Sequence, residues 1–429
     1  MHRVVIVGGG AGGLELAARL GDRAARERIE VVLIDEDLTH VWKPLLHEIA
    51  AGTLDAGSQT EISFLQQARR HGFRFHLGRM DGLDRARRHL WLGALVDDEG
   101  REIAPRRPMP YDTLVIAVGS EVNDFGTPGV REHAMRLDSA HDARRFHRRL
   151  LAACAQAEIQ ERGPVDIVIV GGGATGVELA AELVDAVAEI ASYGEHLRRF
   201  ERPVRVHLVE AGPRLLAALP EDLARSAHRD LEHRGVSVRV GERVTQVQAD
   251  RVVLASGAHL PSAITVWAAG IRAPEVLTRL DGLETNKQRQ LVVTPTLQTT
   301  TDPQVFAMGD CASCMLPGQD APVPPRAQAA QQEADWLARA LVDHVHGRAI
   351  RPFEYRDRGA LVSLGTRDAI GRVDPGTGRR VTLAGLQARW AYWLVQRKHL
   401  LALHGLFRTV MATLGSWLAG RSQPRVKLH

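Results

Sequence analysis

Runs of apolar, β-branched residues alternate along the chain with segments whose apolar residues recur every three or four positions. The first run, Arg3 to Val7, is followed by a glycine cluster and then by Leu14 to Leu20 at helical spacing. A short continuous apolar run is typical of a strand buried on both faces, and the helical period predicts an amphipathic helix after it. A second apolar run, Val31 to Ile34, completes a strand, helix, strand unit. The N-terminal part of the chain is therefore predicted to begin a parallel α/β sheet.

The same pattern returns in the middle of the chain. Val165 to Val170 is again a buried run before glycines, Val177 to Val184 has helical spacing, and Arg205 to Val209 is the next apolar run. Two more runs, 111–120 and 305–310, each end in a glycine turn. The periodicity thus predicts two α/β units, with the second lying between pieces of the first.

Each unit carries a GxGxxG fingerprint between its first strand and its helix. In the first unit Gly8 permits the tight turn, Gly10 lets the backbone approach a diphosphate, and Gly13 lets helix and strand pack closely. Asp35 ends the second strand, where a carboxylate accepts hydrogen bonds from a ribose diol. We therefore predict a dinucleotide at this first site.

The second fingerprint consists of Gly171, Gly173 and Gly176, and its acidic residue is Glu210. One isolated GxGxxG is weak support, but two in full strand, turn, helix context favour two nucleotide sites. A carboxylate at Glu210 would repel the 2′-phosphate of NADPH, so we expect NADH. Arg214 lies close enough in sequence to leave NADPH open.

Composition agrees with a water-soluble globular body, because 45% of the 429 residues are apolar and 25% are charged. Glycines stop the N-terminal apolar run too early for a signal peptide, so no export is expected. Cys154, Cys311 and Cys314 are too few for a disulfide scaffold and fit a reducing cytoplasm.

Two segments can return to the first site: Gly119-Ser120 and Gly309-Asp310 each follow an apolar run. With these segments the chain resembles the two-dinucleotide-binding flavoprotein superfamily, whose fold is like that of glutathione reductase. The resemblance implies non-covalent FAD at the first site, with Asp310 contacting the flavin ribitol, and an NAD domain inserted in a split FAD domain. The expected division is 1–125 and 286–345 for FAD, the latter with a quinone-site helix, 126–164 as a connection, 165–285 for NAD(H), and 346–429 as a C-terminal interface and membrane-anchoring segment.

Thiol chemistry is disfavoured. The segment after the first unit, where disulfide reductases of this superfamily carry a cysteine pair, has none. Cys311 and Cys314 instead adjoin Asp310, so their CxxC spacing is interpreted as structural or incidental.

The resemblance narrows to the type II NADH dehydrogenases, the single-chain NADH:quinone oxidoreductases of respiratory membranes. The match is spread from residue 3 to beyond residue 400. It implies that Gln328 and Gln332 lie at the quinone pocket beside the flavin, that Glu178 lies near the nicotinamide ring, that Lys43 and Pro44 contact FAD, and that Ala269 and Gly270 contact NAD. The segments that carry it are His40 to Gly52, Gly119 to Gly126, Thr265 to Gly270 and Pro325 to Gln332.

Three of these side chains also have an ordinary structural interpretation. Glu178 could be a first-turn acid that complements a helix dipole. Gln328 and Gln332 could belong to the start of an Ala/Gln-rich helix that runs toward Trp336 and Leu341. No metal is expected, because the histidines lack metal-ligand spacing and are interpreted as surface or packing residues, namely His40, His47, His141, His147, His344 and His346.

The positive charge is concentrated at the C-terminus. From Pro375 to His429 there are nine Lys and Arg and no Asp or Glu, which leaves 46 of the 55 basic residues against 51 acids upstream, a balance of −5. Within this region one apolar helical stripe is predicted, and basic residues interrupt every stretch long enough to span a bilayer. Interleaved aromatic and basic residues favour an interfacial helix on anionic lipid through residues 385–429, although a helix docked on the protein itself or on a partner has the same pattern. The stripe comprises Leu406, Phe407, Val410, Met411, Leu414, Trp417 and Leu418.

Together these features predict an FAD-dependent NADH:quinone oxidoreductase that does not pump protons. It is expected as a peripheral protein on the cytoplasmic face of the inner (plasma) membrane, with no nucleic-acid partner; a homodimer is compatible with the sequence. Alternatives are a sulfide:quinone oxidoreductase, which would need redox cysteines, and a soluble NAD(P)H-dependent reductase of a protein electron carrier or a redox-sensing protein.

Overall fold

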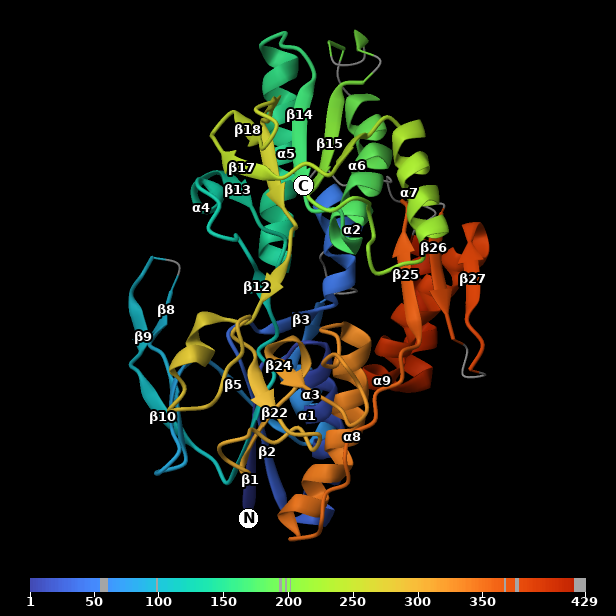
Figure 1. The fold of residues 1–429 in the computed structure, drawn as a ribbon. Helices are drawn as coiled ribbons and strands as arrows, with labels where there is room; N and C mark the ends of the chain where they lie inside the picture. The colour runs from blue at the N-terminus through green and yellow to red at the C-terminus, as the bar shows by residue number, and fades with distance from the viewer. Residues whose placement is uncertain are drawn as a thin grey trace. The chain divides into compact units, whose positions relative to one another are not determined.

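The computed structural model divides into two compact units, each described by itself below (Figure 1). The first unit comprises residues 1–42, 61–121 and 271–357, and the second comprises 43–60, 122–270 and 358–429. These units follow packing, so their bounds differ from the functional domains predicted above, which stay a prediction. The structure describes residues 1–54, 61–97, 99–192, 195–196, 199–200, 202–365, 368–374 and 378–419.

The first unit is built on a five-stranded parallel sheet. Its central strand β1 follows from the apolar run after Arg3, since Val4, Val5 and Ile6 are fully buried. The chain moves outward from β1 to β2 and later returns to the opposite side, so β1 lies where the strand order reverses. Ligands bind at the carboxyl ends of strands at such a reversal. In order across the sheet the strands are β23 (Val305–Ala307), β11 (Thr113–Ile116), β1 (His2–Val7), β2 (Ile29–Asp35) and β5 (Arg74–Leu77).

Three helices accompany this sheet. Helix α1 (Ala11–Glu27) begins directly after the glycine loop and packs against α8 (Ala327–Val345), whose small residues Ala330 and Ala334 are buried. Helix α3 (Phe64–His71) is capped by Ser63, whose hydroxyl accepts the Gln66 N–H. The other elements of this unit are β3 (Thr39–Val41), β4 (Glu61–Ser63), β6 (Met80–Asp84), β7 (His89–Leu92), β8 (Leu95–Val96), β9 (Glu102–Ala104), β10 (Arg107–Pro110), η3 (Glu275–Arg279), β22 (Leu291–Val293), η4 (Gly309–Cys311) and β24 (Ala312–Cys314).

The second unit repeats the same design. Its central strand β14 is buried along its whole length, and the strand order again reverses there. The repeated apolar run, glycine loop and helix therefore fold as predicted, and the two dinucleotide-binding sheets are confirmed. In order across the sheet the strands are β13 (Ala134–Met135), β20 (Ile264–Trp267), β14 (Val165–Val170), β15 (Val204–Glu210) and β16 (Ser237–Val240), all parallel.

Helices of the second unit come from three separate stretches of chain. Helix α6 (Ala174–Ser192) follows the second glycine loop, and α2 (Leu46–Ala51) packs against both α6 and α5 (Ala140–Ile159). Helix α5 begins with a capping box between Ser139 and Asp142. The remaining helical elements are η1 (Lys43–Leu45), α4 (Val130–His133) and α7 (Glu221–His233).

Two three-stranded antiparallel sheets complete the second unit. The first packs its buried valines, Val244, Val247 and Val252, into the core beside β14. The second leads into the C-terminal helix α9 (Gly385–Ala419). Their strands are β17 (Val244–Val247), β18 (Arg251–Leu254) and β19 (His259–Pro261), then β25 (Gly359–Ser363), β26 (Ala369–Val373) and β27 (Val381–Ala384); β12 (Glu121–Val122) and β21 (Ile271–Arg272) lie where the chain passes between the units.

Helix α9 is interrupted at Gly405, whose φ of 69° and ψ of 171° are not helical. The half before Gly405 is anchored by Ala388 and Leu403, which are fully buried. Of the predicted stripe, Val410 and Met411 are about half exposed, at 46% and 54%. The side chains of Leu406, Phe407, Leu414, Trp417 and Leu418 lie outside the part that the structure describes. Among the described residues, none of the helices is both long and apolar enough to cross a membrane.

Candidate functional site

The first glycine loop contains one glycine that the protein itself does not require. A Cβ at Gly8 would lie 2.3 Å from the Ala117 carbonyl oxygen, and one at Gly13 would lie 1.9 Å from the Gly8 oxygen. A Cβ at Gly10 would meet no protein atom within 4 Å. Gly8 and Gly13 are therefore fixed by packing, whereas Gly10 leaves space at the start of α1 where a diphosphate fits the helix N-terminus.

Asp35 lies beside this loop at the end of β2. Its carboxylate accepts the Gly9 N–H at 2.5 Å and the Asp37 N–H at 2.9 Å. Burial raises its pKa, and these two hydrogen bonds oppose that shift. The carboxylate therefore braces the loop at the end of β2 where the sequence predicts a ribose.

Two predicted FAD residues far apart in sequence meet on the other side of β1. The Ser120 hydroxyl donates to the Asp310 carboxylate at 2.8 Å, and the Gln290 amide donates to the Asp310 carbonyl at 2.9 Å. Gly119 and Gly309 both have positive φ, 69° and 71°, which L side chains rarely adopt. The structure thus places Gly10, Ser120 and Asp310 after the carboxyl ends of the neighbouring strands β1, β11 and β23, where ligands bind in sheets of this kind.

Glu333 supports this turn and was missed by the sequence reasoning. It is 2% exposed on the apolar face of α8, and its carboxylate accepts the Gly309 N–H at 2.6 Å. Burial raises its pKa to about 7. The sequence could have indicated a buried acid here, because Glu333 is a charged residue at helical spacing among Ala329, Ala330 and Ala334.

The two predicted quinone-site glutamines lie near the start of α8. The Gln328 amide donates to the Asp357 carboxylate at 3.2 Å. Gln332 donates to the Arg356 carbonyl at 2.9 Å and accepts the Arg356 N–H at 3.1 Å. Both side chains are partly exposed, and Gln332 also holds the chain that leaves the first unit. Their role toward quinone stays a prediction.

Lys43 and Pro44 belong to the second unit, in η1. The Lys43 charge opposes the rise in the pKa of Asp138 that burial causes. The Pro44 carbonyl accepts the Tyr392 hydroxyl at 3.2 Å. Their predicted contact with FAD stays a prediction.

Cys311 and Cys314 are free thiols buried in the first unit. Burial raises the pKa of each to about 12, which keeps both protonated at neutral pH. The Cys311 thiol lies 3.2 Å from the Met308 carbonyl oxygen. A reactive thiol needs the thiolate form, so the arrangement supports the structural interpretation of this CxxC.

The second glycine loop has the same division of roles. A Cβ at Gly171 would lie 2.7 Å from the Ala269 nitrogen, and one at Gly176 would lie 1.9 Å from the Gly171 oxygen. A Cβ at Gly173 would meet nothing within 4 Å. The loop therefore packs on the segment that leads to Gly270, which brings the predicted NAD residues of β14 and β20 together, and Gly173 leaves the open space.

Glu210 occupies the position of Asp35 in this second loop. Its carboxylate accepts the Gly172 N–H at 2.5 Å and the Gly212 N–H at 2.6 Å. Arg214 donates instead to three backbone carbonyls, those of Leu216, Ala217 and Leu219, at 2.8 to 3.4 Å. The guanidinium is thus engaged within its own loop, which favours NADH where the sequence left NADPH open.

A Glu210→Gln variant is expected to narrow the preference for NADH over NADPH. The amide oxygen can still accept the Gly172 N–H, while the charge that repels a 2′-phosphate is removed. The kcat/KM for NADH divided by that for NADPH should fall roughly 5- to 30-fold, which corresponds to about 1–2 kcal/mol of lost discrimination. Glu232→Gln, on an exposed residue near the end of α7, is the matched control. An unchanged ratio in the Glu210 variant would assign nucleotide selection to another group.

Glu178 is not a surface acid of the first helical turn. The first turn of α6 contains no acidic residue, and Glu178 is 6% exposed. Its carboxylate accepts the Ser363 N–H at 3.0 Å and lies 3.6 Å from Nδ1 of His47. Burial raises its pKa to about 8, so it is protonated at neutral pH. Hydrogen bonds from the Ser363 N–H and with Tyr392 oppose this rise in the pKa without cancelling it.

A second group of polar side chains extends this cluster. Burial raises the pKa of Glu48 to about 7 and also raises that of Glu182, which accepts the Thr53 hydroxyl at 2.5 Å. The charge of Arg389 favours the ionised form of both acids, and its guanidinium donates to the Ser363 hydroxyl at 3.0 Å.

His47 takes part in this cluster as a neutral side chain, because burial and the charge of Arg389 lower its pKa to about 3. From the sequence His47 is predicted to be a surface or packing residue, and at 2% exposure it is a packing residue. Its contact with Glu178 was not foreseen.

The free energy of unfolding should depend on pH through Glu178. Its pKa rises from 4.5 to about 8 on folding. The contribution of the protonated carboxyl to the free energy of unfolding is therefore fully present below about pH 4.5 and is lost as the pH rises through 8. Glu178→Gln stays neutral, and its stability relative to the wild type should increase by up to about 1.4 kcal/mol per pH unit in that window. Urea unfolding at several pH values, with Glu232→Gln as control, measures this; a pH-independent difference would show that wild-type Glu178 is already ionised.

Among the described residues, no group of three or more His, Cys, Asp or Glu side chains is placed to hold a metal ion. Buried His40 and His147 are packing residues, while His141 and His346 are exposed.

Comparison with known proteins points to one family. Residues 2–334 match the model of the pyridine nucleotide-disulphide oxidoreductases. A type II NADH:quinone oxidoreductase of Haemophilus influenzae is 39% identical over 447 residues, covering 100% of both chains.

Two solved structures share the fold. NDH2 from Plasmodium falciparum, in complex with NADH, matches with a TM-score of 0.83 and 18% identity over 99% of this chain and 100% of that one. The sulfide:quinone oxidoreductase of Aquifex aeolicus matches with a TM-score of 0.71 and 19% identity over 94% and 92%. At these identities the likeness concerns the fold alone.

Proposed function

The chain belongs to the type II NADH:quinone oxidoreductases, within the pyridine nucleotide-disulphide oxidoreductases, and we propose that it oxidises NADH with bound FAD and reduces a membrane quinone. The observation that carries the proposal is the pair of glycine loops. In each loop the middle glycine faces space that no protein atom fills, while the outer two are fixed by packing. Two such loops on two sheets suit two dinucleotides, one as the resident cofactor and one as the substrate.

FAD suits the first unit, held by Gly10, Asp35, Ser120 and Asp310. When bound, it accepts a hydride and releases two electrons, so the demanding redox chemistry is its own. The chain supplies position: the Gly10 loop receives the diphosphate at the start of α1, and Ser120 orients the Asp310 carboxylate. The Glu333 carboxylate accepts the Gly309 N–H and so stabilises the turn at Gly309.

NADH suits the second unit, with the diphosphate at Gly173 and the adenine ribose at Glu210. Ala269 and Gly270 follow β20, on the opposite side of β14 from Glu210. Glu178 comes from α6, directly behind the loop. Burial raises the pKa of its carboxyl to about 8, which favours a neutral group over a charge at neutral pH.

Thiol-dependent sulfide oxidation is the first alternative, and it fits the chain less well. Cys311 and Cys314 have pKa values raised to about 12 and are buried, and a sulfide enzyme would have no use for the second glycine loop. A soluble reductase of a protein electron carrier is the second alternative. Membrane flotation separates it from the proposal.

The proposed location is peripheral, on the cytoplasmic face of the membrane, with residues 385–429 on anionic lipid. Before Gly405, helix α9 exposes Leu386, Trp390 and Leu394 at 72%, 65% and 58%. These residues are four positions apart and so share one face of the helix. Apolar side chains on a helix that carries basic but no acidic residues are typical of interfacial binding. A homodimer through the same face is the competing use of this surface.

The test is a quinone-reduction assay with purified, FAD-loaded protein. NADH should reduce the flavin and support turnover with a soluble quinone, and NADPH should be at least roughly tenfold less effective in kcat/KM. Sulfide should not bleach the flavin. Bleaching by sulfide without any response to NADH would contradict the proposal.

A further inference from the structure

Phe125 combines two properties that an ordinary packing residue does not combine, a left-handed backbone and an exposed ring. Its φ is 49°, a left-handed conformation that is unfavourable for a bulky side chain. Leu216 and Leu297 share this conformation, but they are 4% and 0% exposed, so their burial offsets the strain. Phe125 is 64% exposed. The surrounding residues therefore hold Phe125 in this strained backbone conformation, and burial of its ring does not offset the strain.

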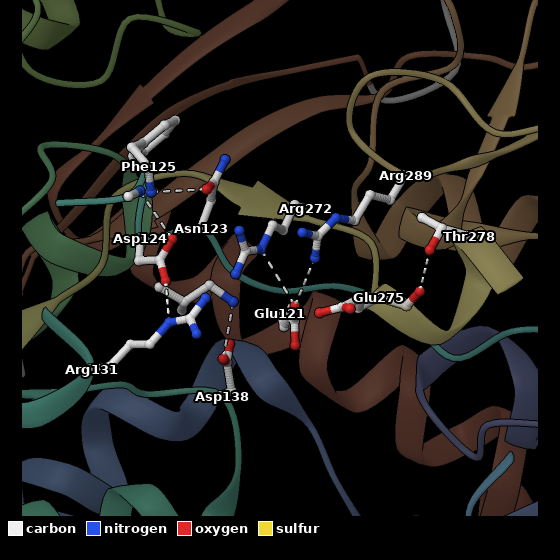
Figure 2. Close-up of polar contacts among 12 residues, drawn as sticks. Glu121, Asn123, Asp124, Phe125, Arg131, Asp138, Arg272, Glu275, Thr278 and Arg289 are labelled. Atoms are coloured by element: carbon white, nitrogen blue, oxygen red, sulfur yellow. Dashed lines mark hydrogen bonds and ion pairs between the residues drawn. The ribbon is translucent and has the colours of Figure 1, made fainter. Parts of the chain in front are cut away.

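Several hydrogen bonds within the second unit impose this conformation (Figure 2). The Asn123 side chain accepts the Phe125 N–H at 3.0 Å, and the Asp124 carboxylate accepts the Gly126 N–H at 3.1 Å. Arg131 donates to the same Asp124 carboxylate at 2.8 Å. The turn that carries Phe125 is thus fixed on both sides of the residue.

The same turn is tied to the end of β20. The indole N–H of Trp267 donates to the Asn123 carbonyl at 2.9 Å, and the Asn123 N–H donates to the Gly270 carbonyl at 3.2 Å. The Phe125 ring lies directly against Gly270, because a Cβ there would be 2.4 Å from its Cζ atom. The ring therefore occupies the place of a side chain at Gly270, three residues beyond β20.

The order of strands tells which part of a dinucleotide would meet this ring. Glu210, the ribose-binding acid of the adenine half, ends β15 on one side of β14. The diphosphate position is at the Gly173 loop after β14 itself. A dinucleotide that crosses the carboxyl ends of the strands in this direction places its nicotinamide half beyond β20, where Gly270 and Phe125 lie.

We propose that the Phe125 ring is a wall of the NADH site that packs against the nicotinamide half, and that the strained turn serves to hold it there. Residues held in unfavourable backbone conformations by their surroundings concentrate at such ligand contacts. An exposed aromatic face binds a planar ring by dispersion and by excluding water. The inference rests on the proposed function, since it needs NADH at the second loop.

The test uses the FAD-loaded enzyme and three substitutions. Phe125→Gly and Phe125→Asn remove the ring and tolerate the left-handed backbone, whereas Phe125→Tyr keeps the ring. Glu161→Gly is the matched control, because Glu161 also has a positive φ, 51°, and is exposed before β14 begins, at the amino-terminal ends of the strands and away from the proposed site. The apparent Kd for NADH comes from the concentration dependence of anaerobic flavin reduction, and ADP-ribose binding reports on the adenine half alone.

Loss of the ring should raise the apparent Kd for NADH about 3- to 10-fold, with ADP-ribose affinity and the KM for quinone within twofold of wild type. Melting temperatures of Phe125→Gly and Glu161→Gly should equal or exceed that of the wild type, and Phe125→Tyr should bind NADH normally. Unchanged NADH affinity in Phe125→Gly and Phe125→Asn would overturn the inference, as would an equal loss of ADP-ribose affinity. A wild-type enzyme that binds neither nucleotide would instead refute the proposed function.

Discussion

A Gly173→Val variant is expected to lose NADH-driven flavin reduction while it keeps its FAD. A side chain at Gly173 would meet no protein atom within 4 Å, so the fold should tolerate the substitution. The added methyl groups would occupy the space over the start of α6, where the diphosphate must approach the backbone. We expect the rate of flavin reduction at a fixed NADH concentration to fall at least about 100-fold, because the charge-assisted hydrogen bonds between the diphosphate and the backbone N–H groups would be lost.

Two matched substitutions make this result specific. Gly10→Val should have the reciprocal effect, with loss of bound FAD and retention of ADP-ribose binding by the second unit. Gly176→Ala should lower the stability of the fold itself, because its Cβ would lie 1.9 Å from the Gly171 oxygen. Flavin content, stopped-flow reduction and thermal unfolding separate the three outcomes. If Gly173→Val lost only FAD, the assignment of the two loops would be reversed.

Removal of residues 406–429 should separate the reaction with NADH from the reaction with membrane quinone. The deletion begins after the interruption of α9 at Gly405, so the buried side chains of Ala388 and Leu403 are retained. NADH oxidation with a small water-soluble acceptor should stay within about twofold of the full-length value. Turnover with a long-chain quinone in anionic vesicles should fall at least about tenfold, since basic and apolar residues that favour the lipid surface are lost.

Salt and the exposed face of the first half of α9 provide the controls for this deletion. Binding of the full-length protein to anionic vesicles should weaken as salt is added, because each basic residue contributes only about 1 kcal/mol and is screened. Replacing Leu386, Trp390 and Leu394 with serine tests the exposed face before Gly405. A truncated protein that floats with vesicles and reduces long-chain quinone normally would assign the tail to packing or to a partner.

The two sheets could be predicted from the sequence because their determinants are local. An apolar run long enough for a buried strand, a glycine loop and a helical period lie consecutively in both copies, so no long-range information was needed. In the first loop, glycine spacing assigned Gly13 to close packing and Gly10 to an open position, and the Cβ distances agree with this division. Gly270 was placed at the NAD site by family resemblance, and no local pattern indicated what would lie against it.

Tertiary structure alone decided the chemistry of the individual groups. Glu178 looks like an acid near a helix start in the sequence, but its burial in the fold raises its pKa to about 8 against the opposing hydrogen bonds of Ser363 and Tyr392. The hydrogen bond between Ser363 and Glu178 joins residues 185 positions apart. In the sequence Phe125 is one aromatic residue next to a glycine. Only the fold shows that its ring lies against Gly270. Periodicity fixes which residues face inward, but burial and its effect on a pKa depend on which distant segments pack there, and only the folded chain specifies that.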